Sequence, residues 1–294
     1  MSKYYILYNP LSCNKLGETK ASNVKNYFPN DDLFFIDITS IRDFKAFFEG
    51  ISANDNIVVC GGDGTLNKFI NYTEGTDIKN EILYYATGSG NDFLRDMGMD
   101  KESKPISIKN EIENLPIVTV NNKSYRFLNG VGFGIDGYCC YVGDKERQKD
   151  SNKKINYTKI AIMGLLFHYK PTSAKVTVDG IEYKFKKVWL CPTMVGRYYG
   201  GGMMPTPMQT RDNKSKSISV LVFHGSSKLK TLMLFPSIFT GKHTNHKKHC
   251  TVLSGKRISV EFDSPTPLQI DGETIENVTK YDAFLSPCPS ACVL

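Results

Sequence analysis

The 294-residue sequence has no apolar stretch that could cross a bilayer. Its longest apolar run, Ile160–Phe167, falls far short of the roughly 20 residues that a spanning helix needs. Because Met1-Ser2-Lys3 leads straight into the strand-like Tyr4–Tyr8, we expect no secretory leader. The eight cysteines show no regular spacing, which argues against a disulfide framework. These absences predict a cytoplasmic protein.

Several common kinds of site are also missing. Cys288 and Cys292 have no second Cys or His pair nearby, so we expect no zinc. There is no RNA-binding aromatic signature, so we expect no nucleic acid, and no Walker A pattern occurs. The net charge of +7 still favours an acidic partner. The basic run Lys242–His249 is either a solvated loop or a membrane-facing patch.

The most informative stretch is a glycine turn at residues 61–67. The apolar run Ile57–Cys60 predicts a buried strand, and Thr65 is placed to cap a helix over Leu66–Tyr72. Such a turn offers backbone N–H groups and a helix N-terminus to an anion. A second turn, at residues 86–93, repeats the design after the strand-like Ile82–Ala86. We interpret the two turns as a phosphate site.

The chain divides into two kinds of pattern. Residues 1–120 alternate strand and helix, which predicts an α/β domain with a parallel sheet and helices on both faces. Ligands on such sheets bind at the carboxyl ends of the strands, where both glycine turns fall. Residues 121–282 carry strand-like segments and hairpin signals, with helical interruptions at Lys153–Tyr169 and Lys228–Phe239. This half is predicted to be all-β, an antiparallel sandwich or barrel.

Two further motifs have an ordinary interpretation and a functional one. Gly132–Gly137 matches the dinucleotide pattern Gly-x-Gly-x-x-Gly, but no clear helix is predicted after it, so we interpret the match as accidental. Asp271-Gly272-Glu273 is typical of a tight turn. Beside a phosphate site, the same turn could supply the carboxylate that phosphoryl transfer needs near an acceptor hydroxyl.

Seven stretches occur in the order typical of one family. Together they resemble the bacterial diacylglycerol kinase and sphingosine kinase–like lipid kinases over nearly the whole length of the chain. The stretches are residues 8–12, 61–67, 88–95, 129–136, 196–203, 237–243 and 270–273.

The resemblance implies an N-terminal three-layer α/β domain similar to NAD kinase and phosphofructokinase. It also implies a C-terminal antiparallel β-sandwich that recognises lipid. Residues 283–294 are a candidate for a tail that returns to the first domain. The implied reaction is ATP- and Mg²⁺-dependent phosphorylation of a lipid hydroxyl, with diacylglycerol as the leading substrate and phosphatidic acid as product. The implied location is peripheral to the inner face of the membrane, and a homodimer is left open.

The resemblance also implies roles for individual residues. Asp63 and Asp92 would organise Mg²⁺ and water, and Asp212 would hold a structural Mg²⁺. Asp271 or Glu273 would act as the base, and the sequence does not choose between them. The residues implied to contact ATP are Asn9, Pro10, Ser12, Gly61, Gly62, Asp63, Gly64, Thr65, Leu66, Asn67, Gly88, Ser89 and Asn91, with Thr39 as a further candidate.

The sequence departs from the family pattern at three places. Cys13 and Asn14 stand where the family has Gly-Lys, and Lys15 is a candidate substitute for that lysine. Lys68 replaces a glutamate, and an expected asparagine near Met194-Val195 is missing. Two alternatives therefore stay open: a soluble NAD kinase–like enzyme, and a catalytically weakened nucleotide or lipid sensor.

Overall fold

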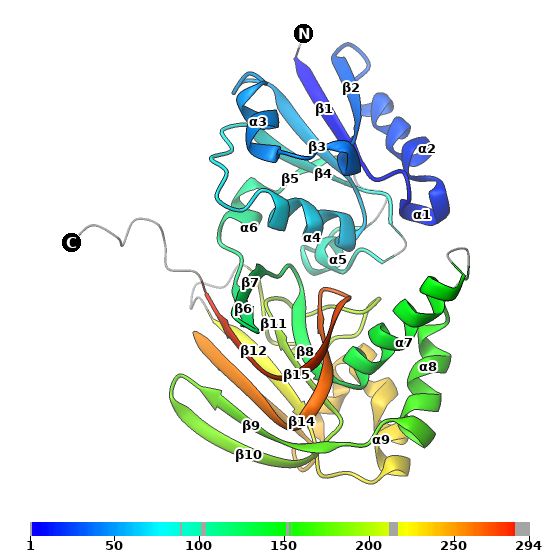
Figure 1. The fold of residues 1–294 in the computed structure, drawn as a ribbon, viewed down its shortest axis with the longest axis vertical. Helices are drawn as coiled ribbons and strands as arrows, with labels where there is room; N and C mark the ends of the chain where they lie inside the picture. Colours follow the sequence, from blue (N-terminus) through cyan, green and yellow to red (C-terminus); the bar gives the residue numbers. More distant parts are fainter. Residues whose placement is uncertain are drawn as a thin grey trace, which may run out of the picture. The chain divides into compact units, whose positions relative to one another are not determined.

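The computed structural model describes residues 2–285 except 89, 101–103, 151, 152, 154 and 212–216. The chain divides after Asn114 into two compact units (Figure 1). The strand β6 (Ile117–Val120) lies before the boundary predicted at residue 120, yet it pairs with β15 (Glu273–Phe284) of the second unit. Ala283 and Phe284, the start of the predicted tail, are part of that pairing, and residues 286–294 lie outside the described residues.

The first unit is built on a five-stranded sheet with the order β2-β1-β3-β4-β5. The first four strands run parallel and β5 is antiparallel to β4. The central β3 contains Ile57, Val58 and Val59, which are fully buried, as expected for a parallel strand covered on both faces. The strand bounds are β1 Lys3–Tyr8, β2 Asp32–Asp37, β3 Asn56–Gly61, β4 Glu81–Ala86 and β5 Ile106–Ser107.

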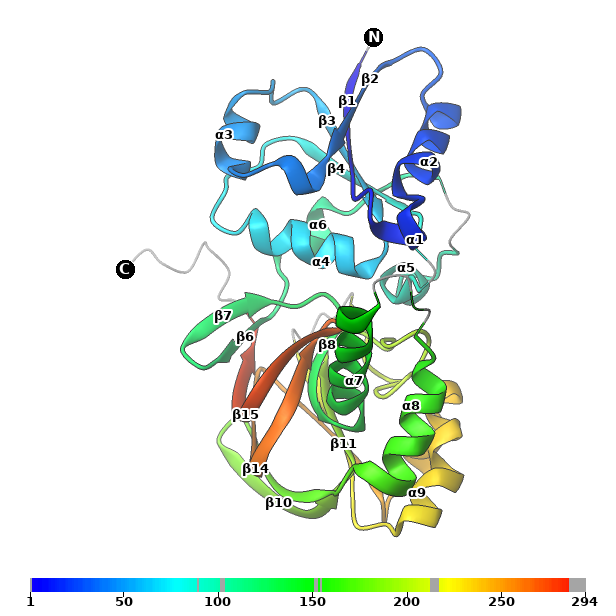
Figure 2. The same cartoon turned by 45° about the vertical axis from the view of Figure 1, so that its right-hand side comes forward.

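Helices cover both faces of this sheet, as predicted. On one face Ala21 and Val24 pack against Ile6, Val58 and Cys60. On the other face lie α3 and α4 (Figures 1 and 2), where the rings of Phe44 and Phe48 lie edge-on to Phe69. The helical bounds are α1 Ser12–Lys15, α2 Gly17–Ala21, η1 Ser22–Tyr27, η2 Ile38–Ser40, α3 Phe44–Glu49, α4 Asp63–Tyr72, α5 Asp92–Asp96 and α6 Lys109–Glu113.

Two local predictions in this unit are wrong. The sequence predicts one helix over Lys15–Tyr27, ended by Pro29. The structure instead has three short helical pieces, because Lys15 has a φ of 67° and breaks the helical path. Thr65 does not cap α4. The helix begins at Asp63, three residues before the predicted start, with Gly62 as its N-cap, and the N–H groups of Thr65 and Leu66 already donate to the Gly62 carbonyl.

The second unit contains an antiparallel sheet of ten strands among the described residues. The order is β13-β12-β11-β8-β14-β15-β6-β7, and β9 pairs with β10 and β14. The predicted hairpin turns are confirmed at Asn121-Asn122 and Asp179-Gly180, all of which have positive φ. The remaining strand bounds are β7 Lys123–Arg126, β8 Gly130–Gly134, β9 Thr172–Val178, β10 Ile181–Val188, β11 Leu190–Met194, β12 Ile218–Phe223, β13 Cys250–Gly255 and β14 Arg257–Ile270.

Helices cover part of this sheet and share a core with it. Leu165 and Ile238 pack with Trp189, Leu221 and Phe223. The two predicted helical interruptions are confirmed, but a third helix follows Gly132–Gly134 directly. The expectation that no helix follows this motif is therefore wrong, although the sheet is antiparallel and no βαβ unit frames it. The bounds are α7 Ile135–Lys149, α8 Tyr157–Met163, η3 Gly164–His168, α9 Lys228–Leu234, η4 Phe235–Thr240 and η5 Lys242–Asn245.

Candidate active site

Three of the predicted segments meet at one edge of the first sheet. Asn9 follows β1, Gly62 follows β3 and Thr87 follows β4, and these three strands are neighbours that run in parallel. Their carboxyl ends therefore lie side by side, which is where α/β sheets bind ligands. The sequence prediction of one shared edge is confirmed within this unit.

The two glycine turns pack backbone against backbone. A β-carbon at Gly88 would lie 2.6 Å from the Cα of Gly62, so a side chain at Gly88 would push the turns apart. The Gly61 carbonyl accepts a hydrogen bond from the Thr87 N–H at 2.8 Å and another from the Tyr84 hydroxyl at 3.1 Å. Burial raises the pKa of Tyr84, so this hydroxyl stays protonated and remains a donor. The turns form one rigid structure.

Asp63 joins the first turn to the helix after the second. Its carboxylate accepts hydrogen bonds from the backbone N–H of Asp92 at 2.8 Å and of Phe93 at 3.4 Å. The side chain thus caps α5, whose own flanking residue Asn91 donates from Nδ2 to the Gly88 carbonyl at 3.1 Å. Asp92 is buried.

The first turn of α4 is open on one side. A β-carbon added at Gly64 would meet no heavy atom within 4 Å. By contrast, three of the residues expected to contact ATP, Thr65, Leu66 and Asn67, are buried. Leu66 in particular is fully buried, so its side chain belongs to the core and only its backbone remains for a ligand. A ligand can therefore approach the helix N-terminus at Gly64.

The Asn9–Ser12 segment forms a compact turn beside this edge. The Asn9 side-chain oxygen accepts from the Leu11 N–H at 2.9 Å, and the Ser12 hydroxyl donates to the Asn9 carbonyl at 2.7 Å. Gly17 is required here because its β-carbon would lie 1.9 Å from that carbonyl. Thr39, the further candidate, follows β2 and donates to Asp37 from both its N–H and its hydroxyl.

Lys20 is a candidate that the sequence did not single out. Its Nζ donates to the Thr87 carbonyl at 3.1 Å, and the Cys13 thiol donates to the same oxygen at 2.8 Å. Lys20 thus places a cation directly before Gly88, whereas Lys15, the predicted substitute, is exposed. Lys20, five residues after Lys15, reaches the second turn because α2 packs over this end of the sheet. No spacing rule in the sequence indicates this contact.

The second unit holds the Asp271–Glu273 turn. The Asp271 carboxylate accepts hydrogen bonds from the backbone N–H groups of Leu128, Asn129 and Gly130. Arg211, which the sequence did not indicate, donates to the Leu128 carbonyl at 2.6 Å. Asp271 is therefore fixed, with a φ of 48°, and Glu273 is exposed.

Two of the predicted site residues, Ser89 and Asp212, lie outside the described residues. Lys68 is exposed on α4. In the described part of the chain, no group of three or more His, Cys, Asp or Glu side chains could hold a metal ion. Over the same part, no helix is long and apolar enough to cross a membrane.

Comparison with known families accounts for both units. Residues 3–120 match the diacylglycerol kinase catalytic domain, and residues 129–288 match the YegS C-terminal NAD kinase beta sandwich-like domain. The chain is 23% identical over 268 residues to "Putative lipid kinase YtlR" of Bacillus subtilis, covering 86% of this chain and 82% of that protein. It is 27% identical over 199 residues to a "Diacylglycerol kinase" of Mycobacterium tuberculosis, covering 64% and 61% respectively.

A solved structure shows the same fold. The crystal structure of a "putative diacylglycerol kinase" from Bacillus anthracis superposes with a TM-score of 0.67 at 19% identity, over 97% of this chain and 92% of that one. The matches define a kinase with an α/β catalytic domain and a β-sandwich-like domain. The chain belongs to the diacylglycerol kinase–like family of lipid kinases, as the sequence predicted.

Proposed function

We propose that the protein transfers the γ-phosphoryl group of ATP to the hydroxyl of diacylglycerol, giving phosphatidic acid. The observation that carries this proposal is the pair of joined glycine turns, with the open N-terminus of α4 at Gly64 and the Lys20 ammonium beside Gly88. Backbone N–H groups and a cation at such an edge suit the phosphates of a nucleotide. The lipid acceptor is supported by the family and by the names of the relatives.

The donor set at this edge fits Mg²⁺. This ion is commonly held by one or two carboxylates together with phosphate oxygens and water, so a dedicated protein cage is not needed. Asp63 offers such a carboxylate, already oriented by two backbone N–H groups. When bound, Mg²⁺ would neutralise charge on the phosphate oxygens. Asp63 would hold it, and the buried Asp92 would order the surrounding water.

The Asp271–Glu273 turn would supply the base toward the lipid hydroxyl. The two carboxylates differ in how they are held: Asp271 is bound by three backbone N–H groups, and Glu273 is exposed. Glu273→Gln should therefore affect phosphoryl transfer alone, with little effect on folding. Asp271→Asn should affect both phosphoryl transfer and folding, so its activity is compared with its free energy of unfolding. The variant that loses activity without losing stability identifies the base.

A phosphorylation panel tests the function. Purified protein receives labelled ATP and Mg²⁺ with diacylglycerol, sphingosine or NAD, in separate reactions. We expect labelled phosphatidic acid in the first reaction and no labelled NADP in the last. Labelled NADP would establish the soluble NAD kinase–like alternative. Nucleotide binding with no product from any acceptor would establish the sensor.

A further inference from the structure

The helices of the second unit form a layer with two different sides. Their inner sides, which include Leu165, Leu234 and Ile238, are buried in one core with strands of the sheet. Their outer sides carry large apolar residues that are exposed to solvent. We call these residues the apolar ridge: Ile162 (41% exposed), Met163 (40%), Phe167 (66%), Leu229 (67%) and Met233 (67%).

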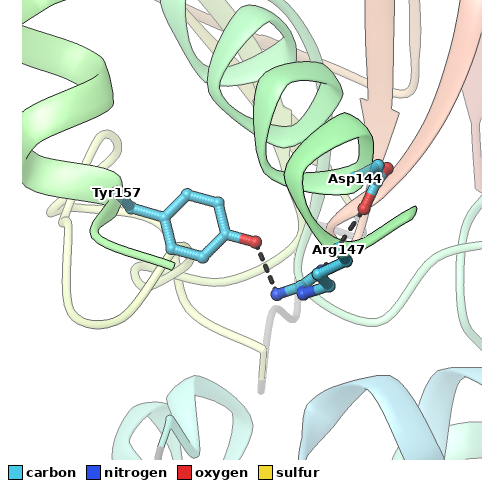
Figure 3. A network of polar contacts seen from close by, with 3 residues as sticks. All are labelled: Asp144, Arg147 and Tyr157. Carbon is cyan, nitrogen blue, oxygen red and sulfur yellow. Dashed lines mark hydrogen bonds and ion pairs between the residues drawn. The ribbon is translucent and has the colours of Figure 1, made fainter. Parts of the chain in front are cut away.

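The ridge belongs to one continuous and well-anchored surface. The Lys228 ammonium at the start of α9 donates to the Leu166 carbonyl of η3 at 3.0 Å, and α8 and α9 lie side by side in both views (Figures 1 and 2). At the start of α8, the Tyr157 hydroxyl accepts from Arg147 of α7 at 2.7 Å, and Arg147 also pairs with Asp144 (Figure 3). The Tyr157 ring lies against Gly143, where a β-carbon would meet it at 2.9 Å.

The sequence segments that contain the ridge are strongly basic. The ridge lies within two sequence segments, residues 151–178 and 213–260, that together contain fourteen Lys and Arg and no Asp or Glu. This local excess is twice the net charge of +7 of the whole chain, so the remainder of the protein is net negative. On the helices themselves, Lys159, Lys228 and Lys230 are exposed, and Lys170 is exposed just beyond η3.

We propose that the apolar ridge docks the protein on a membrane surface that contains anionic phospholipids. The ridge side chains would enter the boundary between headgroups and acyl chains, and the flanking lysines would lie among the phosphates. An apolar side flanked by lysines is the pattern of an interfacial helix, and each lysine near an anionic surface adds favourable electrostatic energy. The inference rests on the proposed function, since it places the enzyme where its lipid acceptor resides.

Vesicle sedimentation without nucleotide tests the docking surface. We expect the protein to pellet with phosphatidylcholine vesicles that contain about a third phosphatidylglycerol, and much less with phosphatidylcholine alone. The triple variant Phe167→Gln, Leu229→Gln, Met233→Gln should bind roughly tenfold more weakly or worse, because three inserted apolar groups are lost. Ile181→Gln is the matched control: Ile181 is 61% exposed but lies on β10, and its loss should change nothing.

The lysines that flank the apolar ridge are tested by separate variants. Lys159→Gln and Lys230→Gln should each weaken binding about fivefold, and added salt should abolish the difference. Lys184→Gln on β10 is the control. Lys228 is left unchanged because its ammonium also holds the Leu166 carbonyl.

Two readouts separate this inference from the proposed function. With diacylglycerol in nonionic detergent micelles, the triple variant should phosphorylate lipid at the wild-type rate, and with vesicles it should not. If no lipid is phosphorylated in either format but the variants still lose vesicle binding, docking stands and the proposed function fails. Docking is overturned if wild-type protein does not bind anionic vesicles, or if the triple variant binds as well. It is also overturned if the substitutions only convert a dimer to a monomer.

Discussion

The Asp63 carboxylate accepts a hydrogen bond from the backbone N–H of Asp92 at 2.8 Å, so a residue of the first glycine turn caps the helix that follows the second. This side chain fixes the relative position of the turns, and in the proposed function it also presents its charge to Mg²⁺. The two roles can be separated by substitution, because the single oxygen of an amide can accept the shorter capping hydrogen bond, from the Asp92 N–H, but does not carry the charge.

Asp63→Ala should lower the free energy of unfolding by about 1–2 kcal/mol, the usual cost of removing a helix cap. Asp63→Asn should recover most of that loss. If the charge holds Mg²⁺, both variants lose kinase activity by about a hundredfold or more, since an ion that stabilises the transferred group is missing. Urea unfolding and labelled-phosphate transfer, measured on the same preparations, check this. Full activity in Asp63→Asn would show that Asp63 acts only as a helix cap.

Cys13 occupies a backbone position that favours glycine. Its φ is 54°, in the left-handed region that glycine adopts without strain. Cys13→Gly should therefore raise the free energy of unfolding by about 1 kcal/mol relative to Cys13→Ala, which also lacks the thiol but keeps the β-carbon. Thermal and urea unfolding of the two variants give the comparison. Equal stability would show that the segment relaxes without cost.

Lys20 donates to the Thr87 carbonyl of the second glycine turn, whereas Lys15 is exposed. Substitutions of these two lysines can therefore be compared directly. Lys20→Met should weaken ATP binding by about tenfold or more, the value of one charge-assisted contact with phosphate. Lys15→Met should change it less than about twofold, because Lys15 is exposed. The KM for ATP and a direct binding isotherm measure both. An equal effect of the two substitutions would contradict the assignment of Lys20.

The buried Asp136 carboxyl should make the stability of the protein fall as the pH rises. It is buried at the start of α7, where it accepts hydrogen bonds from the Tyr199 hydroxyl and the Gln269 amide, both at 3.3 Å. Burial raises the pKa of its carboxyl from 3.8 to about 6. The folded state thus holds this proton more tightly than the unfolded state. The stability that it contributes is present below pH 4 and is lost as the pH rises through 6.

Asp136→Asn removes this titration. Between pH 4 and pH 7, wild-type protein should lose up to about 3 kcal/mol of stability relative to the variant. Urea unfolding at several pH values supplies both curves. If the two curves stay parallel, Asp136 does not titrate in this range.

The sequence predicted β1, β3 and β4 of the first unit well because these strands are short and apolar, and because β3 and β4 are each followed by a glycine turn. It missed α7 for a physical reason. Gly137 and Gly143 weaken the helical pattern, yet each is required by tertiary packing: a β-carbon at Gly137 would lie 2.1 Å from the Pro267 carbonyl, and one at Gly143 would meet Tyr157. Contacts between residues so far apart along the chain leave no local signal.

The same limit applies to the site. The edge of the sheet and the identity of its turns could be predicted, because both follow from consecutive residues. The cap from Asp63 to Asp92 spans 29 residues, and the clamp on Gly130 by Asp271 spans 141, so their roles emerge only from the fold. The Lys20 contact depends on the break in the helix near Lys15, which no propensity indicates.

The central claim, that phosphates lie against the first turn of α4, is tested most directly at Gly64. Apart from its own stretch of helix, a methyl group there meets no heavy atom within 4 Å, so Gly64→Ala should leave the fold intact and stabilise the helix by about 0.5–1 kcal/mol. If the open space holds phosphate, the same methyl group blocks it. We predict that Gly64→Ala unfolds at higher urea concentration than wild type and binds ATP at least about tenfold more weakly. A variant that is stable and binds ATP as tightly as wild type would contradict this account.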